Sequence, residues 1–210
     1  MSVMPVDRQY NVLSKLYDLY FGIGTLWVMK NYQKKAVKEI GLRDGDVVLD
    51  LGCGTGLLFE YLVREVGPNG RVVGIDISPG MIKKAKEKVK RNEWQNVELV
   101  CADLTKHELN VKADAIIFCL TLSLIPDHEH LFRESLKYLK QGGTVVVADS
   151  WKQYKKWYHK LTNAFITLKA PIVYSDPDNR LGEIIPRYLN NVTSKEALFG
   201  VYSIMKGYTS

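Results

Sequence analysis

The stretch Val47-Val48-Leu49-Asp50-Leu51-Gly52-Cys53-Gly54-Thr55-Gly56 decides the fold of this chain. Residues 47–51 form an apolar run with one acid, which is typical of a buried parallel strand. Glycines follow at alternate positions, and a helical pattern begins at Leu57. At such a strand-to-helix turn, backbone N–H groups and the positive end of the helix can approach a ligand closely. The stretch therefore predicts a site for a small molecule.

The spacing of these glycines points away from a phosphate ligand. It reads G-x-G-x-G, whereas the dinucleotide fingerprint requires G-x-G-x-x-G and the phosphate loop requires G-x-x-x-x-G-K-[ST]. No lysine follows Gly56, and Asp50 stands directly before the turn. A carboxylate there would repel phosphate and attract a cation, so we expect an electropositive ligand.

Composition sets limits without selecting a partner. A chain of 210 residues is long enough for one domain with a substantial core. The net charge of +6 permits nucleic acid, anionic membrane or acidic substrates. The 3 cysteines, Cys53, Cys101 and Cys119, form no C-x-x-C pair, which predicts buried reduced thiols, a cytoplasmic protein and no metal site. The longest apolar stretch, residues 113–126, is shorter than the about 20 residues that cross a bilayer, so membrane contact would be peripheral.

Strands and helices alternate from residue 46 onward. We predict strands over 47–51, 71–77, 97–102, 113–120 and 144–149, helices over 57–66, 79–92 and 129–140, and a closing hairpin of 186–192 and 199–206. This order predicts an α/β fold with a mostly parallel seven-stranded sheet, a C-terminal antiparallel hairpin and helices on both faces. We expect one domain over 41–210, preceded by a helical lid or membrane-contact segment over 1–40.

Acids stand at the carboxyl ends of three predicted strands, where ligands bind in such sheets. Asp50 ends the first strand, Asp76 the second and Asp103 the third. Asp76 has the position, about 20 residues beyond the glycine turn, that hydrogen-bonds ribose hydroxyls in nucleoside-binding α/β folds. A surface turn would explain one of these acids, but a cationic nucleoside explains all three together.

The segments V-L-D-L-G-C-G-T-G, G-I-D-I-S and C-A-D-L together resemble class I S-adenosylmethionine-dependent methyltransferases, over roughly residues 45–150. The resemblance implies a Rossmann-like fold and S-adenosylmethionine as cofactor. It places Gly52 and Gly54 at the methionine part, Asp50 near its amino-acid end and Asp76 at the ribose. It places the adenine against Ile77 and Met81, with Asp103 and Leu104 reading its edge. The full set of expected cofactor contacts is Tyr17, Asp50, Gly52, Cys53, Gly54, Asp76, Ile77, Met81, Asp103, Leu104, Leu120 and Ser123.

Three shorter segments give a narrower resemblance. Residues 17–22 are similar to the entry helix of ubiquinone/menaquinone and phospholipid methyltransferases. Residues 120–127 resemble the S-L-T-M-I-P segment of bacterial phosphatidylethanolamine and betaine-lipid N-methyltransferases, and residues 198–204 resemble their final strand. The segment after the fourth strand lacks the N-P-P-Y type signature of enzymes that methylate bases, which argues against nucleic acid.

An amine acceptor must be neutral before it attacks a methyl group, so the site needs a base or a suitable local field. The candidate catalytic residues are Tyr17, Tyr20, Asp127 and His128. The tyrosines would hold a methylated ammonium through cation–π attraction, or else belong to the core. Asp127 would otherwise cap a helix, and His128 would otherwise lie on a solvated helix start.

Aromatic and lysine residues alternate over 151–174, a mixture that suits either a membrane surface or a helix packed on the sheet. Beyond it, Arg180 and Arg187 could clamp a substrate phosphodiester or form surface ion pairs. The candidate substrate contacts are Tyr174, Arg180, Arg187 and Tyr188.

The sequence thus predicts an S-adenosylmethionine-dependent methyltransferase that N-methylates a phospholipid headgroup amine, such as phosphatidylethanolamine, at the membrane surface. Alternatives are a quinone C-methyltransferase, a small-molecule N- or O-methyltransferase, and a non-catalytic cofactor-binding interaction module. We expect a cytoplasmic protein able to contact the inner face of an anionic membrane peripherally, with no nucleic acid and no metal.

Overall fold

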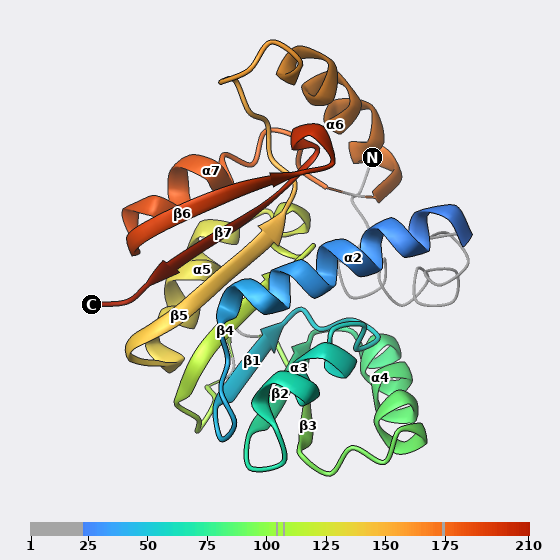
Figure 1. The fold of residues 1–210 in the computed structure, drawn as a ribbon, viewed down its shortest axis with the longest axis vertical. Helices are drawn as coiled ribbons and strands as arrows, with labels where there is room; N and C mark the ends of the chain where they lie inside the picture. The colour runs from blue at the N-terminus through green and yellow to red at the C-terminus, as the bar shows by residue number, and fades with distance from the viewer. Residues whose placement is uncertain (1–22, 104, 107, 174) are drawn as a thin grey trace.

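The computed structural model describes residues 23–103, 105–106, 108–173 and 175–210 (Figure 1). Strands and helices alternate through most of this length. In chain order the elements are α2 (Ile23–Ile40), β1 (Val47–Leu51), α3 (Phe59–Val66), β2 (Arg71–Asp76), α4 (Pro79–Arg91), β3 (Val97–Cys101), β4 (Ala113–Cys119), α5 (His128–Ser135), β5 (Leu139–Asp149), α6 (His159–Val173), α7 (Leu181–Ile184), β6 (Asn190–Ala197) and β7 (Tyr202–Tyr208).

The strands form one seven-stranded sheet in the order β3-β2-β1-β4-β5-β7-β6. The strands β1 to β5 pair in parallel, and β7 runs antiparallel to both β5 and β6. The predicted α/β class, the seven strands and the closing antiparallel hairpin are confirmed. Because β1 and β4 are neighbours on opposite sides of the point where the strand order reverses, their carboxyl ends open a crevice.

Helices cover both faces of the sheet. On one face, α2, α3 and α4 pack their apolar sides on β1, β2, β4 and β5. On the other face, α5 and α7 enclose a second core that includes Leu49, Phe118 and Phe132. The helix α2 lies across the near face in Figure 1, and its Tyr32 hydroxyl donates a hydrogen bond to the Ser203 carbonyl of β7 at 3.0 Å. These contacts make α2 part of the core.

Several predicted boundaries are wrong. The strand expected over 199–206 is β7, which begins only at Tyr202, because Leu198–Gly200 form a 3-10 turn. The helix expected over 129–140 ends at Ser135, where the serine hydroxyl donates to the Phe132 carbonyl at 2.6 Å and so competes with the helical pattern. One turn of 3-10 helix follows, and Leu139 already pairs with Ala113 at the start of β5. The hairpin begins at residue 190 instead of 186, because Ile185-Pro186-Arg187 forms a 3-10 turn that buries Ile185 in the second core.

The cysteines are free thiols, as their spacing predicts, but only Cys53 of the three is buried: Cys119 is partly exposed and Cys101 is exposed. It ends β3, which is an edge strand and therefore lacks a neighbour on one side. Within the described ranges, none of the helices has the length and apolar character needed to cross a bilayer.

Candidate functional site

A cavity of about 380 Å³ opens at the carboxyl ends of β1, β2 and β4. The glycine turn forms its floor, and the ends of β2 and β3 form one wall. The loop after β4, residues 120–127, forms the opposite wall. Of the expected cofactor contacts, the cavity brings together Asp50, Gly52, Cys53, Gly54, Asp76, Ile77, Met81, Asp103 and Leu120. Tyr17 and Leu104 lie outside the described residues.

The glycine turn folds back on β2. The amides of Gly52 and Cys53 both donate to the Ile75 carbonyl, at 2.8 and 3.0 Å. Gly52 has a φ of +76°, and a β carbon there would come within 2.7 Å of the Thr121 hydroxyl oxygen. Gly54 has a φ of +55°, and a β carbon there would meet nothing within 4 Å, so its backbone faces open space in the cavity. The turn therefore presents bare backbone to a ligand.

Asp76 joins the end of β2 to this turn. Its carboxylate accepts hydrogen bonds from the Gly54 amide at 2.9 Å and from the Ser78 amide at 2.8 Å. Burial raises the pKa of Asp76, while these two backbone bonds favour the charged form and limit the rise. The Ser78 hydroxyl accepts from the Met81 amide and Pro79 stands in the first turn of α4, so Ser78 is the N-cap of this helix.

Asp50 lies at the base of the cavity and is 1% exposed. One of its carboxylate oxygens, Oδ2, is buried without a hydrogen-bond partner among the described residues. Burial, and next the charge of Asp76, raise the pKa of Asp50 to about 8. A buried acid with a vacant acceptor fits a cationic ligand, since a positive group would both pair with it and restore its charge. The residues present thus fit a sulfonium amino acid of the S-adenosylmethionine kind.

The wall beyond Asp76 combines apolar and polar groups suited to a purine ring. Ile77 is 38% exposed and lines the cavity together with Met81 and Ala102. Asp103 also lines it, but its carboxylate already accepts from the Thr105 amide and hydroxyl, at 3.0 and 2.7 Å. Burial opposes ionisation there, yet the bonds from Thr105 and Lys106 keep the pKa of Asp103 below its usual value.

A buried acid that the sequence analysis did not single out holds the loop that forms the opposite wall. Asp149, at the end of β5, accepts from the amides of Thr121, Ser123 and Ser150 and from the Ser123 hydroxyl. The Ser123 side chain is thereby turned away and does not line the cavity. Asp149 stands at a strand end like the other three acids, and that placement was the signal available in the sequence. Gln33 and Thr121, which also line the cavity, carry no comparable signal.

Two of the four candidate catalytic residues, Tyr17 and Tyr20, lie outside the described residues. Asp127 lines the cavity mouth, and its side chain makes no capping hydrogen bond at the start of α5. His128 is buried and its Nδ1 lies 3.0 Å from the Ile125 carbonyl, so a solvated helix start is wrong for it. It does not line the cavity, because this contact holds the ring against the loop backbone.

The structure does not bring the described candidate substrate residues to this cavity. Arg180 pairs with Glu183 and lines a separate hollow of about 790 Å³. Arg187 is exposed, and the Tyr188 hydroxyl donates to Glu129 at 2.8 Å. Arg180 therefore forms a surface ion pair, which was the alternative to a phosphodiester clamp. Tyr174 lies outside the described residues.

A mixed sheet of this order, with a glycine turn facing acids at strand ends, defines a nucleoside-binding α/β protein of the Rossmann-like class. The family described as Methyltransferase domain matches residues 42–191, and the chain belongs to that family. It is an enzyme, an S-adenosylmethionine-dependent methyltransferase of class I, as the resemblance implied.

Two relatives are similar to this chain in sequence, and one solved structure is similar to it in fold. A demethylmenaquinone methyltransferase of Listeria welshimeri is 27% identical over 168 residues, which cover 80% of this chain and 71% of the relative. A demethylmenaquinone methyltransferase of Staphylococcus aureus is 34% identical over 146 residues, covering 69% of this chain and 60% of the relative. The phosphoethanolamine N-methyltransferase 2 of Haemonchus contortus, solved with phosphomonomethylethanolamine and S-adenosylhomocysteine, superposes with a TM-score of 0.76 at 16% identity, covering 99% of this chain and 60% of that one.

Proposed function

We propose that this enzyme methylates a ring carbon of a lipid-soluble quinol of the demethylmenaquinol type. The observation that carries the proposal is the apolar wall opposite the nucleoside side of the cavity. That wall is made by Leu120, Leu124, Ile125, Pro126 and Leu131. A flat apolar ring would pack against it and displace water, as methyl transfer requires. Two curated relatives that carry the demethylmenaquinone methyltransferase name support the same choice.

The reaction needs little covalent chemistry from the protein. A quinol ring carbon would attack the methyl group, the sulfur–methyl bond would break, and its electron pair would remain on sulfur in S-adenosylhomocysteine. The ring would then lose a proton, and Asp127 is the acid placed at the cavity mouth to receive it or a hydroxyl proton. The main work of the site would be to hold the two carbons about 3–3.5 Å apart in line with sulfur.

We assign the cofactor to the floor and the β2–β3 wall. Gly52, Cys53 and Gly54 would contact the methionine part, Asp50 its ammonium and Asp76 the ribose hydroxyls. Ile77, Met81 and Asp103 would surround the adenine. Leu120 would then stand between the two halves of the cavity, next to the reacting methyl group. The vacant oxygen of Asp50 is the strongest support for this orientation.

Cofactor binding should release a proton near neutral pH. With a pKa of about 8, Asp50 is mostly protonated at pH 7 in the free protein. A bound ammonium stabilises its carboxylate, so affinity should fall up to about tenfold per pH unit as the pH drops below 8. Titration calorimetry with S-adenosylhomocysteine in buffers of different ionisation enthalpy measures that proton directly. Asp50→Asn should abolish the release, and an equal release in this variant would contradict the assignment.

The raised pKa of Asp50 also determines how the free energy of unfolding of the free protein changes with pH. The pKa of Asp50 is raised from 3.8 to about 8, so the folded chain holds a proton that the unfolded chain gives up. Without ligand, this residue therefore lowers the free energy of unfolding as the pH rises from 3.8 toward 8, and Asp50→Asn should remove that dependence.

Asp127→Asn should lower kcat on the true acceptor by about 100-fold or more, because a general base typically contributes about 100-fold to 10,000-fold. The dissociation constant of S-adenosylhomocysteine should stay within about twofold. Turnover is followed by mass spectrometry of a demethylmenaquinone kept reduced in detergent micelles. Glu87→Gln is the matched control, since it removes an exposed acid from α4, far from the cavity lining.

A phosphatidylethanolamine amine is the second candidate, and Asp127 favours it too. A carboxylate at the cavity mouth would attract an ammonium and then accept its proton. The same assay with phosphatidylethanolamine micelles separates the two acceptors. Gain of a methyl group on the quinol alone supports the first proposal, and gain on the phospholipid alone replaces it with the second. Gain on neither, with turnover of a water-soluble amine, would overturn both.

A further inference from the structure

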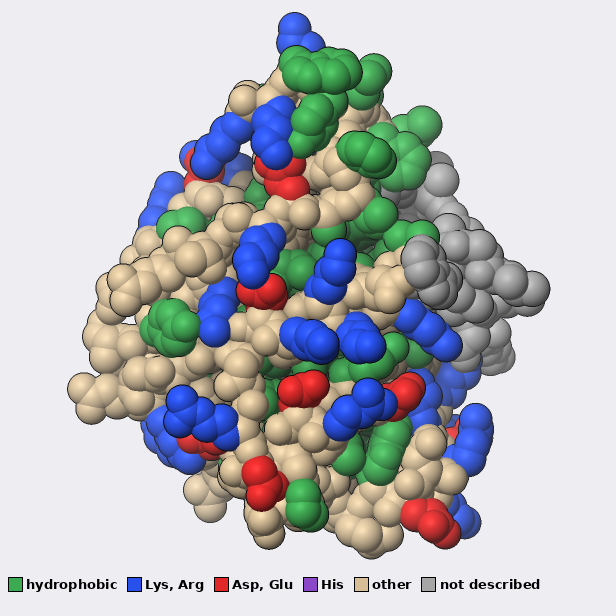
Figure 2. Space-filling model, viewed as in Figure 1, with side chains coloured by type: hydrophobic (Ala, Val, Ile, Leu, Met, Phe, Trp, Pro, Cys, Tyr) green, Lys and Arg blue, Asp and Glu red, His purple; other side chains and the backbone are tan. Residues whose placement is uncertain are grey.

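Large apolar side chains lie exposed along one face of α6 and in the turn directly before it. Trp157, Leu161, Phe165 and Leu168 are 84%, 71%, 52% and 73% exposed. Leu161, Phe165 and Leu168 are spaced by four and three residues, which puts them on one side of α6, and Trp157 lies in the turn directly before the helix. His159, Thr162 and Ile166 fall on the opposite side and are buried. We name the first four residues the α6 surface; Figure 2 shows hydrophobic side chains gathered at this end of the molecule, with basic side chains beside them.

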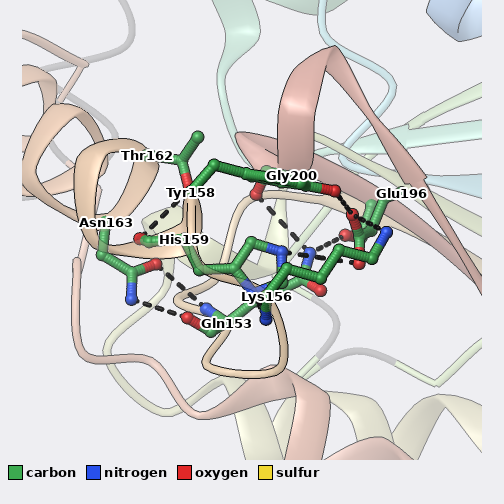
Figure 3. Close-up of polar contacts among 9 residues, drawn as sticks. Gln153, Lys156, Tyr158, His159, Thr162, Asn163, Glu196 and Gly200 are labelled. Carbon is green, nitrogen blue, oxygen red and sulfur yellow. Dashed lines mark hydrogen bonds and ion pairs between the residues drawn. The ribbon is translucent and has the colours of Figure 1, made fainter.

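A network of polar contacts fixes the direction in which the α6 surface faces. Glu196 of β6 accepts from the Lys156 ammonium and the Tyr158 hydroxyl, each at 2.9 Å (Figure 3). The Nδ1 atom of His159 accepts from the Lys156 amide at 3.1 Å, which sets the tautomer with hydrogen on Nε2, and Nε2 lies 3.5 Å from Glu196. The start of α6 is therefore tied to the β6–β7 hairpin.

A second set of contacts ties the chain before α6 to the same hairpin. Gln153 and Asn163 exchange two hydrogen bonds, at 3.0 and 2.7 Å, between the backbone of one and the side chain of the other (Figure 3). The Gln153 side chain also donates to the Ser203 hydroxyl at 2.5 Å. With its inner side anchored in this way, α6 cannot rotate to bury its apolar face without losing these bonds.

The charged side chains that the chain segment around the α6 surface contributes are all basic. The stretch 151–173 contains lysines and no acidic residue. Lys152 and Lys156 pair with acids from elsewhere in the fold, Asp178 and Glu196. Lys155 and Lys160 are exposed, and neither has an ion-pair partner in the part of the chain that the structure describes. An anionic surface would complement them, and a second copy of this face would oppose lysine to lysine.

The α6 surface also stands close to the cavity in the fold. Figure 1 shows α6 beyond the carboxyl ends of β4 and β5, the edge at which the cavity opens. In the chain after α6, the Asp176 amide donates to the Ser123 carbonyl at 2.6 Å. Ser123 directly precedes Leu124, Ile125 and Pro126 of the apolar wall. A surface bound by α6 would thus lie next to the acceptor side of the cavity.

We propose that the α6 surface docks on an anionic lipid bilayer, with Trp157, Leu161, Phe165 and Leu168 in the interface and Lys155 and Lys160 on the headgroups. Exposed apolar rings beside lysines are the combination that binds such an interface. This deepens the proposed function, because a membrane-borne acceptor would reach the apolar wall from that side, but its own evidence is independent of which acceptor reacts.

Vesicle sedimentation tests the proposal with the full chain. We expect the protein to bind phosphatidylcholine vesicles that contain phosphatidylglycerol and to bind pure phosphatidylcholine vesicles much more weakly. Lys155→Gln with Lys160→Gln should lower the partition coefficient by about fivefold per lysine, the effect of one basic residue near an anionic membrane. Lys83→Gln with Lys86→Gln is the matched control: it removes the same charge from the exposed side of α4 and should change binding much less.

Leu161→Ser and Leu168→Ser test the apolar part, since both side chains are exposed and their loss should leave the fold and S-adenosylhomocysteine binding unchanged. Each should weaken vesicle binding several-fold. Equal losses in the α4 control, or no loss in the leucine variants, would overturn the proposal. So would a wild-type dimer in sedimentation velocity that becomes a monomer in Leu161→Ser, which would assign this face to a second copy. Vesicle binding without turnover of either lipid acceptor would overturn the proposed function alone.

Discussion

Asp76→Ala should weaken S-adenosylhomocysteine binding by roughly 100-fold to 10,000-fold. In the proposed orientation the two ribose hydroxyls donate to this carboxylate, and a hydrogen bond to a charged group contributes about 1.5–3 kcal/mol. Two such bonds amount to about 3–6 kcal/mol, and about 1.4 kcal/mol is a factor of ten in affinity. The substitution also frees the Gly54 amide, which Asp76 now holds at 2.9 Å. Titration calorimetry at fixed pH measures the loss.

Asp103→Ala serves as the comparison for Asp76. Its carboxylate is already engaged by Thr105 and Lys106, so it has less capacity for a ligand and its loss should cost about tenfold or less. Thermal unfolding of both variants without ligand checks that the fold survives. An Asp76→Ala protein that is folded and binds with unchanged affinity would defeat the ribose assignment.

Gly52→Ala should disable the site and destabilise the protein together. The residue has a φ of +76°, where an L side chain is strained, and the new β carbon would press on the Thr121 side chain. Left-handed backbone costs about 1–2 kcal/mol and overpacking about 1–3 kcal/mol, so the free energy of unfolding should fall by about 2–5 kcal/mol. Because Thr121 lines the cavity wall and Gly52 its floor, cofactor binding should fall as well.

Gly142→Ala is the control that separates the cost of backbone strain from the cost of the contact with Thr121. Gly142 has a φ of +70°, but a β carbon there would meet nothing within 4 Å, and it does not line the cavity. We expect a loss of only about 1–2 kcal/mol in urea unfolding, with unchanged S-adenosylhomocysteine affinity. If both variants lost the same stability and kept the same affinity, the contact between Gly52 and Thr121 would have no role.

Much of the fold could be predicted because its signals are local. Buried parallel strands such as Val47–Leu51 are short apolar runs, and glycine or capping residues mark the turns between them. The acids that end β1, β2 and β3 were found for the same reason, since a strand end is visible in the sequence. Boundaries were wrong where distant contacts decide, as at Leu139, which pairs with Ala113.

The acceptor side was harder to predict because its groups work through partners far along the chain. Asp149 shapes the cavity wall by holding Thr121 and Ser123, which lie 28 and 26 residues before it. Arg180 had the right chemistry for a phosphate, but Glu183 pairs with it beside a different hollow. Nothing in the spacing of these residues reveals such contacts, whereas the apolar face of α6 follows from helical periodicity once its opposite side is known to be buried.

The position of β7 between β5 and β6 has a consequence for biosynthesis. The ribosome makes β6 before the strand that joins it to the sheet, so a nascent chain that stops before Tyr202 holds β6 with no strand to pair with. The same chain lacks Ser203, to which Tyr32 of α2 is bonded. Translation of residues 202–208 therefore provides the strand that pairs with both β5 and β6. It also provides the Ser203 carbonyl to which α2 is hydrogen-bonded. A stop codon at the start of this short segment would leave β5 at the edge of the sheet and β6 without a partner strand.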